Sequence, residues 1–179
     1  MEVCFFGPLF TMQSVLPSMR ARRSGLIVNL TSASGQFSVP SGALYSAAKF
    51  ALEGATEGLI AETTEFGIKA LIVQPGAFKT NFFGGMESGG DVAEAYAKGA
   101  VGRTLGAFGV AHGNQKGDPG KAAERMVEYV VGEGLGGQLK DKVTRMVLGP
   151  DCWATLDGKT KKLREDILLC KEVAESTDF

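Results

Sequence analysis

The sequence predicts an α/β fold in which short parallel strands alternate with helices within one domain. Short apolar runs bounded by glycine, proline or hydroxyl residues are typical of strands buried in a parallel sheet. Longer stretches between them repeat apolar residues at the spacing of amphipathic helices. Alternation of the two is the pattern of a sheet covered by helices on its faces. We expect strands at about 26–31, 68–74 and 143–148, and helices at about 8–22, 43–65, 119–131 and 151–174.

The composition is that of a globular domain and excludes several classes of function. With 179 residues, 44% hydrophobic and 22% charged, the chain can bury one core. A net charge of −1 gives no reason to expect nucleic acid or an acidic membrane as a partner. No apolar run approaches the ~18 residues of a membrane span and no secretory leader is evident, so we expect a cytoplasmic protein. Cysteine and histidine are too scattered for a disulfide framework or a metal site; these residues are Cys4, Cys152, Cys170 and His112.

The first helix and the first strand lead directly to a reactive side chain. Leu9, Met12 and Leu16 recur at helical spacing, and the arginines that follow them suit a helix C-terminus. A glycine ends this segment, and the apolar strand at 26–31 comes next. Ser32 then lies at the carboxyl end of the strand, which is where open parallel sheets bind their ligands.

The second helix carries two more functional groups. The loop after Ser32 leads into an alanine-rich helix that contains Tyr45 and Lys49. Residues four apart share one helix face, so the phenol and the ammonium group are expected close together. A Tyr-x-x-x-Lys pair by itself also occurs on ordinary surface helices.

Together these groups suit proton transfer. A phenol with a pKa near ~10 exchanges protons poorly at neutral pH, and a neighbouring cation such as Lys49 is expected to lower that pKa. The hydroxyl of Ser32 can hydrogen-bond a substrate oxygen whose charge changes during the reaction. No side chain here can carry a hydride, so a redox reaction would need a nicotinamide.

The motifs resemble those of the short-chain dehydrogenase/reductase family. They comprise segment 29–32 (NLTS), Tyr45 with Lys49, and segment 73–80 (VQPGAFKT) after the second strand. The resemblance implies a partial Rossmann-like fold and hydride transfer between NAD or NADP and a small-molecule alcohol or carbonyl. In it Tyr45 is the acid–base group, Lys49 lowers its pKa and contacts the nicotinamide ribose, and Ser32 positions the oxygen. The implied cofactor-binding residues are Tyr45, Lys49, Pro75, Gly76, Phe78 and Thr80.

The resemblance also implies a partner and two departures from the family. In the family the helices matching 8–22 and 43–65 commonly form a homodimer interface, although the small residues of helix 43–65, such as Ala47, Ala51 and Gly54, also suit packing within one chain. Cys4 stands where the family has a catalytic asparagine, and it lacks the paired donor and acceptor of an amide. Phe78 replaces a small aliphatic residue and could narrow the pocket.

Region 84–120 is glycine-rich and follows the second strand, with a helix expected at about 91–104. Loops of this kind often close over ligands, and in the family this region shapes substrate specificity. Its apolar residues suggest a hydrophobic small molecule, although they also suit ordinary packing under a loop; they are Phe82, Phe83, Met86 and Phe108.

The remaining elements carry no catalytic motif. Asp118 followed by proline is a helix start, and that helix ends in segment 132–137 (GEGLGG). This G-x-G-x-x-G follows a helix instead of a strand, so we interpret it as a helix cap and loop, not a pyrophosphate site. The third strand and the last helix complete the chain, which we treat as one domain, 1–179.

Two hypotheses follow because the family's glycine-rich dinucleotide-binding half has no counterpart in these residues. In the first, the chain is the catalytic part of an NAD(P)-dependent oxidoreductase, with doubtful cofactor binding on its own. In the second, it is a non-catalytic homologue that pairs through helices 8–22 and 43–65. Binding of NADH or NADPH to the purified chain distinguishes them.

Overall fold

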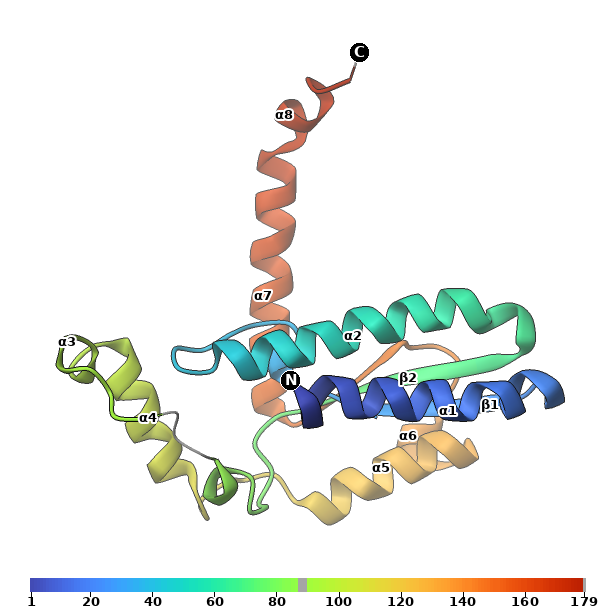
Figure 1. Cartoon of the computed structure of the whole chain (residues 1–179), viewed down its shortest axis with the longest axis horizontal. Helices are drawn as coiled ribbons and strands as arrows, with labels where there is room; N and C mark the ends of the chain where they lie inside the picture. The colour runs from blue at the N-terminus through green and yellow to red at the C-terminus, as the bar shows by residue number, and fades with distance from the viewer. Residues whose placement is uncertain (87–89, 179) are drawn as a thin grey trace.

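The computed structural model describes residues 1–86 and 90–178, in which one parallel sheet lies between two layers of helices (Figure 1). Strands β1 (Gly25–Leu30), β2 (Ile68–Pro75) and β3 (Arg145–Leu148) pair in the order β1-β2-β3. Both pairings are parallel, with Gly25 opposite Ile68 and Ile72 opposite Arg145. The expected α/β fold with three parallel strands is confirmed.

Each face of the sheet has its own hydrophobic core. Helices α1 (Gly7–Arg22) and α2 (Ala43–Thr63) cover one face, and α5 (Pro119–Val131) covers the other (Figure 1). The two faces are separate because successive residues of a strand point to opposite sides. The first core contains Met12, Ile27, Leu52 and Leu59, and the second contains Leu71, Val73, Tyr129, Met146 and Leu148.

The helix boundaries follow from local chemistry. Asp118 caps α5 by accepting hydrogen bonds from the backbone N–H groups of Gly120 (2.8 Å) and Lys121 (3.3 Å). Gly67 has a positive φ of 68° where the chain turns from α2 into β2. A side chain there would meet the carbonyl oxygen of Arg23 at 2.6 Å, so this turn requires glycine.

The region between β2 and α5 differs from its prediction. In place of one helix at 91–104 the chain forms α3 (Glu94–Ala97) and α4 (Ala100–Ala111). The break falls at Gly99, whose ψ of −158° is not helical, and α4 then continues through Gly106 and Gly109, which face open space. Residues 87–89 of the expected substrate-side loop 84–120 lie outside the described residues.

The last helix is interrupted once and leaves the body of the molecule. Helix α7 (Pro150–Leu169) is followed by the short α8 (Lys171–Glu175), and α7 projects away from the sheet (Figure 1). Among the described residues, no helix is long and apolar enough to cross a membrane. The remaining short helical turns are η1 (Glu2–Phe6), η2 (Ala33–Gly35), η3 (Thr64–Phe66), η4 (Phe83–Gly85) and α6 (Gly134–Gly137).

Candidate functional site

Ser32 lies at the carboxyl end of β1. Because β1 and β2 are parallel, the carboxyl end of β2 lies at the same end of the sheet. The preceding residue, Thr31, continues the pairing because its backbone N–H donates to the carbonyl of Val73 at 2.8 Å. The side-chain oxygen of Ser32 accepts a hydrogen bond from the backbone N–H of Ser34 (3.1 Å) and so caps the short helix η2. This cap fixes the hydroxyl at the tip of the strand.

Tyr45 and Lys49 approach Ser32 from the first turns of α2. The Nζ atom of Lys49 donates to the carbonyl of Leu30 at 3.0 Å, which ties α2 to the end of β1. The same atom lies 5.9 Å from the centre of the Tyr45 ring. The side chain of Ser32 lies close enough to the Tyr45 phenol to lower its pKa as a hydrogen-bonding neighbour. The three residues therefore meet in one place.

The electrostatics of this place differ from the sequence-based expectation. Burial raises the pKa of Tyr45 above its ordinary value of 10.0, and it outweighs the hydrogen bond from Ser32, which lowers the pKa. Burial also lowers the pKa of Lys49 from 10.5. The expectation that Lys49 leaves Tyr45 with a lowered pKa is therefore wrong for this structure, because the desolvation of the phenol is the larger effect.

Cys4 lies close enough to act electrostatically on both groups. Its Coulombic interaction raises the pKa of Tyr45 and of Lys49, in each case less than burial changes it. The η1 turn at the start of the chain thus brings a thiol to the site, at the position where the resemblance implies an asparagine amide.

A buried carboxylate beneath the Ser32 loop is a part of the site that sequence reasoning missed. Glu53 of α2 is 2% exposed. It accepts hydrogen bonds from Thr31 Oγ1 (2.9 Å), Gln36 Nε2 (2.5 Å), Gln74 Nε2 (2.9 Å) and Arg145 Nε (3.0 Å). These donors come from the ends of β1 and β2, the loop after Ser32, and β3. Glu53 therefore joins the strand ends to the helix that carries Tyr45.

The turn after β2 holds the expected cofactor-side residues. The N–H of Gly76 donates to the carbonyl of Leu148 (2.8 Å), and the N–H of Ala77 donates to Asp151 Oδ2 (2.7 Å). Phe78 packs against the core cluster on the α5 face of the sheet and pairs with Gly117. Thr80 is exposed, and its hydroxyl accepts a hydrogen bond from the N–H of Phe82 at 3.3 Å.

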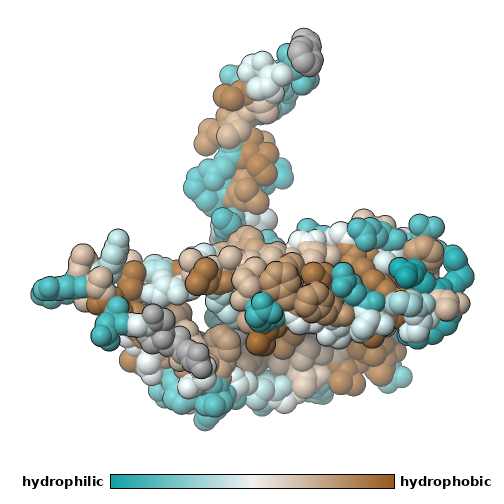
Figure 2. Space-filling model, viewed as in Figure 1, coloured by the Kyte–Doolittle hydropathy of each residue, from teal (hydrophilic) through white to brown (hydrophobic). Residues whose placement is uncertain are grey.

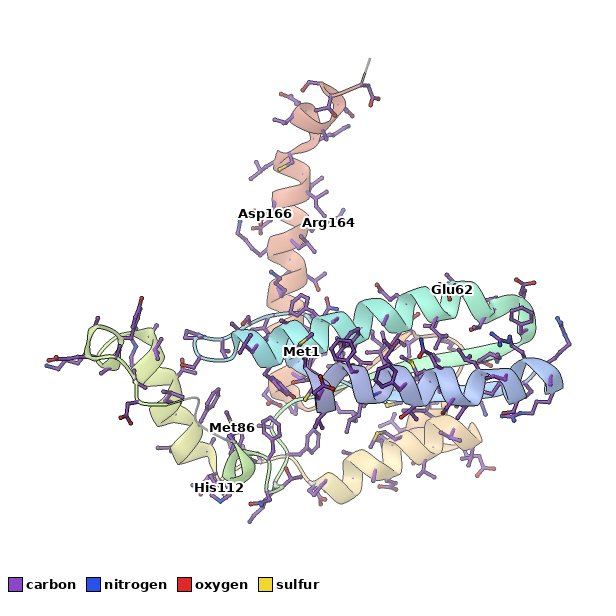
Figure 3. The ribbon with its side chains drawn as sticks, in the orientation of Figure 1. Met1, Glu62, Met86, His112, Arg164 and Asp166 are labelled. Carbon is purple, nitrogen blue, oxygen red and sulfur yellow. The ribbon has the colours of Figure 1, made fainter. Side chains whose placement is uncertain are left out.

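A chain of aromatic rings connects Tyr45 with a pocket. Tyr45 contacts Phe82 (5.7 Å between ring centres), Phe82 contacts Phe83 (5.5 Å), and Phe83 contacts Phe108 of α4 (5.5 Å). The pocket has a volume of about 580 Å³ and is lined mainly by apolar side chains. Figure 3 labels two of its lining residues, Met86 and His112, beside α4.

Other residues singled out from the sequence are engaged in structural contacts. Cys152 is 1% exposed and its Sγ donates to the carbonyl of Gln74 (3.2 Å), and burial raises the pKa of this thiol to about 12. In segment 132–137, Gly132 caps α5, but the rest forms α6 where a loop was expected. The N–H of Gly136 donates a hydrogen bond to Glu128 Oε2 (2.7 Å), so this backbone donor of the glycine motif is already paired with an acidic side chain. No cluster that could hold a metal ion occurs among residues 1–86 and 90–178.

Comparisons with known proteins find similarity to short-chain dehydrogenases and oxidoreductases. Residues 1–89 match the family model described as short chain dehydrogenase. Over 82 residues the chain is 48% identical to the oxidoreductase claN of Passalora fulva, covering 46% of this chain and 38% of that protein. Over 82 residues it is also 45% identical to the 3-ketodihydrosphingosine reductase of Bacteroides thetaiotaomicron, covering 46% of this chain and 30% of that protein. The chain thus spans about a third of the length of these curated relatives.

A solved structure extends the similarity to nearly the whole chain. The crystal structure of a short-chain dehydrogenase from Streptomyces avermitilis matches with a TM-score of 0.79 and 36% sequence identity. The match covers 99% of this chain and 61% of that chain. The similarity therefore includes the sheet, the site and the projecting helix.

Proposed function

Because the chain belongs to the short-chain dehydrogenase/reductase family, we propose that it carries the proton-transfer residues for oxidation of an alcohol or reduction of a carbonyl. The observation that carries the proposal is the meeting of Ser32, Tyr45 and Lys49 at the carboxyl ends of β1 and β2. A hydroxyl, a phenol and an ammonium group in one half-buried place provide the acid, the base and the oxygen-binding donor that such a reaction needs.

The roles follow from the contacts of each side chain. The phenol of Tyr45 gives its proton to the oxygen of a carbonyl substrate, or takes one from an alcohol. The Ser32 hydroxyl lies beside that phenol and donates to the same substrate oxygen as charge develops on it. Lys49, anchored on Leu30, stabilises the phenolate that remains after transfer. Closure of the site by a substrate strengthens these interactions because it removes water.

The residues at this edge suit the nicotinamide end of a dinucleotide. The ammonium of Lys49 and the hydroxyl of Thr80 are donors for a ribose and a carboxamide, and Pro75 ends β2 with Gly76 directly after it. Bound nicotinamide would supply or accept the hydride that no protein side chain can carry. In the described part of the chain no G-x-G-x-x-G turn follows a strand and opens a helix, so we expect residues 1–179 alone to bind NADH and NADPH weakly.

The pocket lined by Phe83 and Phe108 suggests the class of substrate. Phe83 lines this pocket and is linked to Tyr45 by ring contacts through Phe82, and the lining side chains are mainly apolar. We infer that a hydrophobic alcohol or carbonyl compound lies there, with region 84–120 as the substrate side of the domain. One relative is named 3-ketodihydrosphingosine reductase, which is consistent with a carbonyl substrate.

The proposal is tested in a chimera that supplies the part of the fold these residues do not match. The 179 residues replace the matching region of the Streptomyces avermitilis dehydrogenase, and NADPH consumption is followed with a panel of hydrophobic ketones. We expect turnover that Tyr45→Phe abolishes and Ser32→Ala strongly reduces. A folded chimera that binds NADPH but reduces none of the ketones, or whose turnover survives Tyr45→Phe, would contradict the proposal.

A second candidate function is that of a non-catalytic partner protein. The observation that favours it is a set of exposed apolar residues on α1 and α2, namely Phe10 (60% exposed), Leu44 (83%) and Phe50 (43%). Figure 2 displays apolar side chains gathered over these helices. Such a protein would pair through α1 and α2 with no need for the phenol of Tyr45, so turnover by the chimera separates the two functions.

A further inference from the structure

Most of helix α7 has no contact that explains its stability. In the described part of the chain, only the first turns of α7 are held by the body: Cys152 is buried, and the carboxylate of Asp151 accepts a hydrogen bond from the N–H of Ala77. All described residues from Gly158 to the end of α8 are exposed, and the helix projects from the sheet (Figure 1). Isolated helices of about 12 residues are marginal in water, and Gly158 weakens this one further.

The projecting helix carries an apolar seam with the repeat of a coiled coil. The residues of this seam are spaced alternately three and four residues apart, which averages to the 3.5-residue period of packed helix pairs. Several are large and exposed, such as Trp153 (63%), Leu163 (51%) and Ile167 (62%). Figure 2 displays apolar side chains along α7 between polar ones. The seam consists of Trp153, Leu156, Thr160, Leu163, Ile167 and Cys170.

We propose that α7 pairs in antiparallel orientation with α7 of a second copy of this chain. The pairing is centred between Lys161 and Lys162, both of which point away from the seam. In this register Leu156 packs against Ile167 of the second copy, and Thr160 packs against its Leu163. The same contacts recur by two-fold symmetry, so the seam from Trp153 to Cys170 is covered over about 27 Å.

The charges beside the seam select this register. Lys159 and Asp166 flank one side, and Asp157 and Arg164 flank the other; Figure 3 displays Arg164 and Asp166 on opposite sides of the helix. The antiparallel register puts Lys159 opposite Asp166 of the second copy, and Asp157 opposite its Arg164. Each pair occurs twice and joins opposite charges.

Other registers bring like charges together. A shift of one heptad in one direction places Arg164 opposite Arg164 and Asp166 opposite Asp166. The reverse shift places Lys159 opposite Lys159, and a parallel pairing places Lys159 beside Arg164. Within the described residues, the acids already pair along the helix with Lys161 and Lys162, whereas Lys159 and Arg164 have no ion pair. These two cations are therefore available to the second copy.

A second copy is the occupant that this surface fits best because the surface is self-complementary. One helix face supplies both members of each charged pair and both sides of each apolar layer, as a two-fold symmetric interface requires. A different protein would need to reproduce the same charge pattern in reverse. The proposal is independent of the catalytic role of Tyr45.

The test is the mass of the 179-residue chain in solution, measured by sedimentation velocity over a range of concentrations. We expect a reversible dimer. Ile167→Asp places a charge in the seam and is expected to weaken dimerisation by roughly a hundredfold or more. The matched control is Leu169→Asp, because Leu169 is 79% exposed and lies off the seam, and its dimerisation is expected to stay unchanged.

A charge exchange tests the register. Arg164→Asp is expected to weaken the dimer, and adding Asp157→Arg is expected to restore it, since the two charges then face each other in reverse order. Circular dichroism checks that each variant keeps its helices. A chain that stays monomeric, a dimer that survives Ile167→Asp, or an exchange that fails to restore dimerisation would overturn the proposal.

Discussion

Replacement of Glu53 by alanine is expected to destabilise the chain strongly, although Glu53 lies outside every motif. The carboxylate is 2% exposed, and its removal leaves the amide of Gln74, which is 0% exposed, without that acceptor. An orphaned buried donor costs about 1–3 kcal/mol. Loss of the ion pair with Arg145 and of the buried methylenes adds about 2 kcal/mol. This cost is limited because Arg145 keeps its ion pair with Glu57.

The free energy of unfolding should therefore fall by about 3–5 kcal/mol, a large fraction of the roughly 5–15 kcal/mol of a typical domain. Urea unfolding followed by circular dichroism measures this change. Glu57→Ala is the matched control: Glu57 bonds the same guanidinium at 2.7 Å but is 54% exposed, so its loss should cost about 1 kcal/mol or less. Equal costs for the two variants would show that the buried carboxylate does not organise the strand ends.

Three further predictions concern local structure and pH. Gly67→Ala should destabilise by more than about 1 kcal/mol because of the positive φ and the contact with Arg23, whereas Gly58→Ala, in open space within α2, should stabilise by about 0.5–1 kcal/mol; urea midpoints compare the two. Asp118→Ala should cost about 1 kcal/mol through loss of the α5 cap, and an unchanged midpoint would exclude that role. Because burial raises the pKa of Tyr45, the folded chain holds this proton more tightly than the unfolded chain and should lose stability as pH rises above 10.0. The Tyr45→Phe variant should lose less stability above pH 10.0 than the wild-type chain. Identical profiles of stability against pH for the two proteins would contradict the prediction.

Local patterns in the sequence predict the fold and the proximity of three candidate site residues. The apolar runs bounded by glycine and proline correspond to β1, β2 and β3 within two residues at each end. The helix starting after Asp118 was predictable because an N-cap acid followed by proline is a local signal. The meeting of Tyr45 and Lys49 with the strand end follows from helix spacing and sheet topology.

Features set by distant contacts were not predictable. Glu53 draws its partners from sites 22, 21 and 92 residues away, and nothing near it in sequence marks it as buried. The direction of the Tyr45 pKa depends on how deeply the phenol is covered, which spacing does not reveal. The end of helix α4 was predicted too early because Gly106 and Gly109 are poor helix formers. The structure accommodates both glycines within the helix, where each faces open space.

The Ser32 hydroxyl and the Tyr45 phenol act as one site, in which the serine lowers the pKa of the phenol. Near-ultraviolet absorbance measures phenolate formation as pH rises, and subtracting the titration of Tyr45→Phe isolates Tyr45. The midpoint should lie above 10.0, and Ser32→Ala should raise it further because the lost hydrogen bond lowers the pKa, while Ser38→Ala in the same loop should leave it unchanged. A Tyr45 midpoint that Ser32→Ala does not move would contradict the claim.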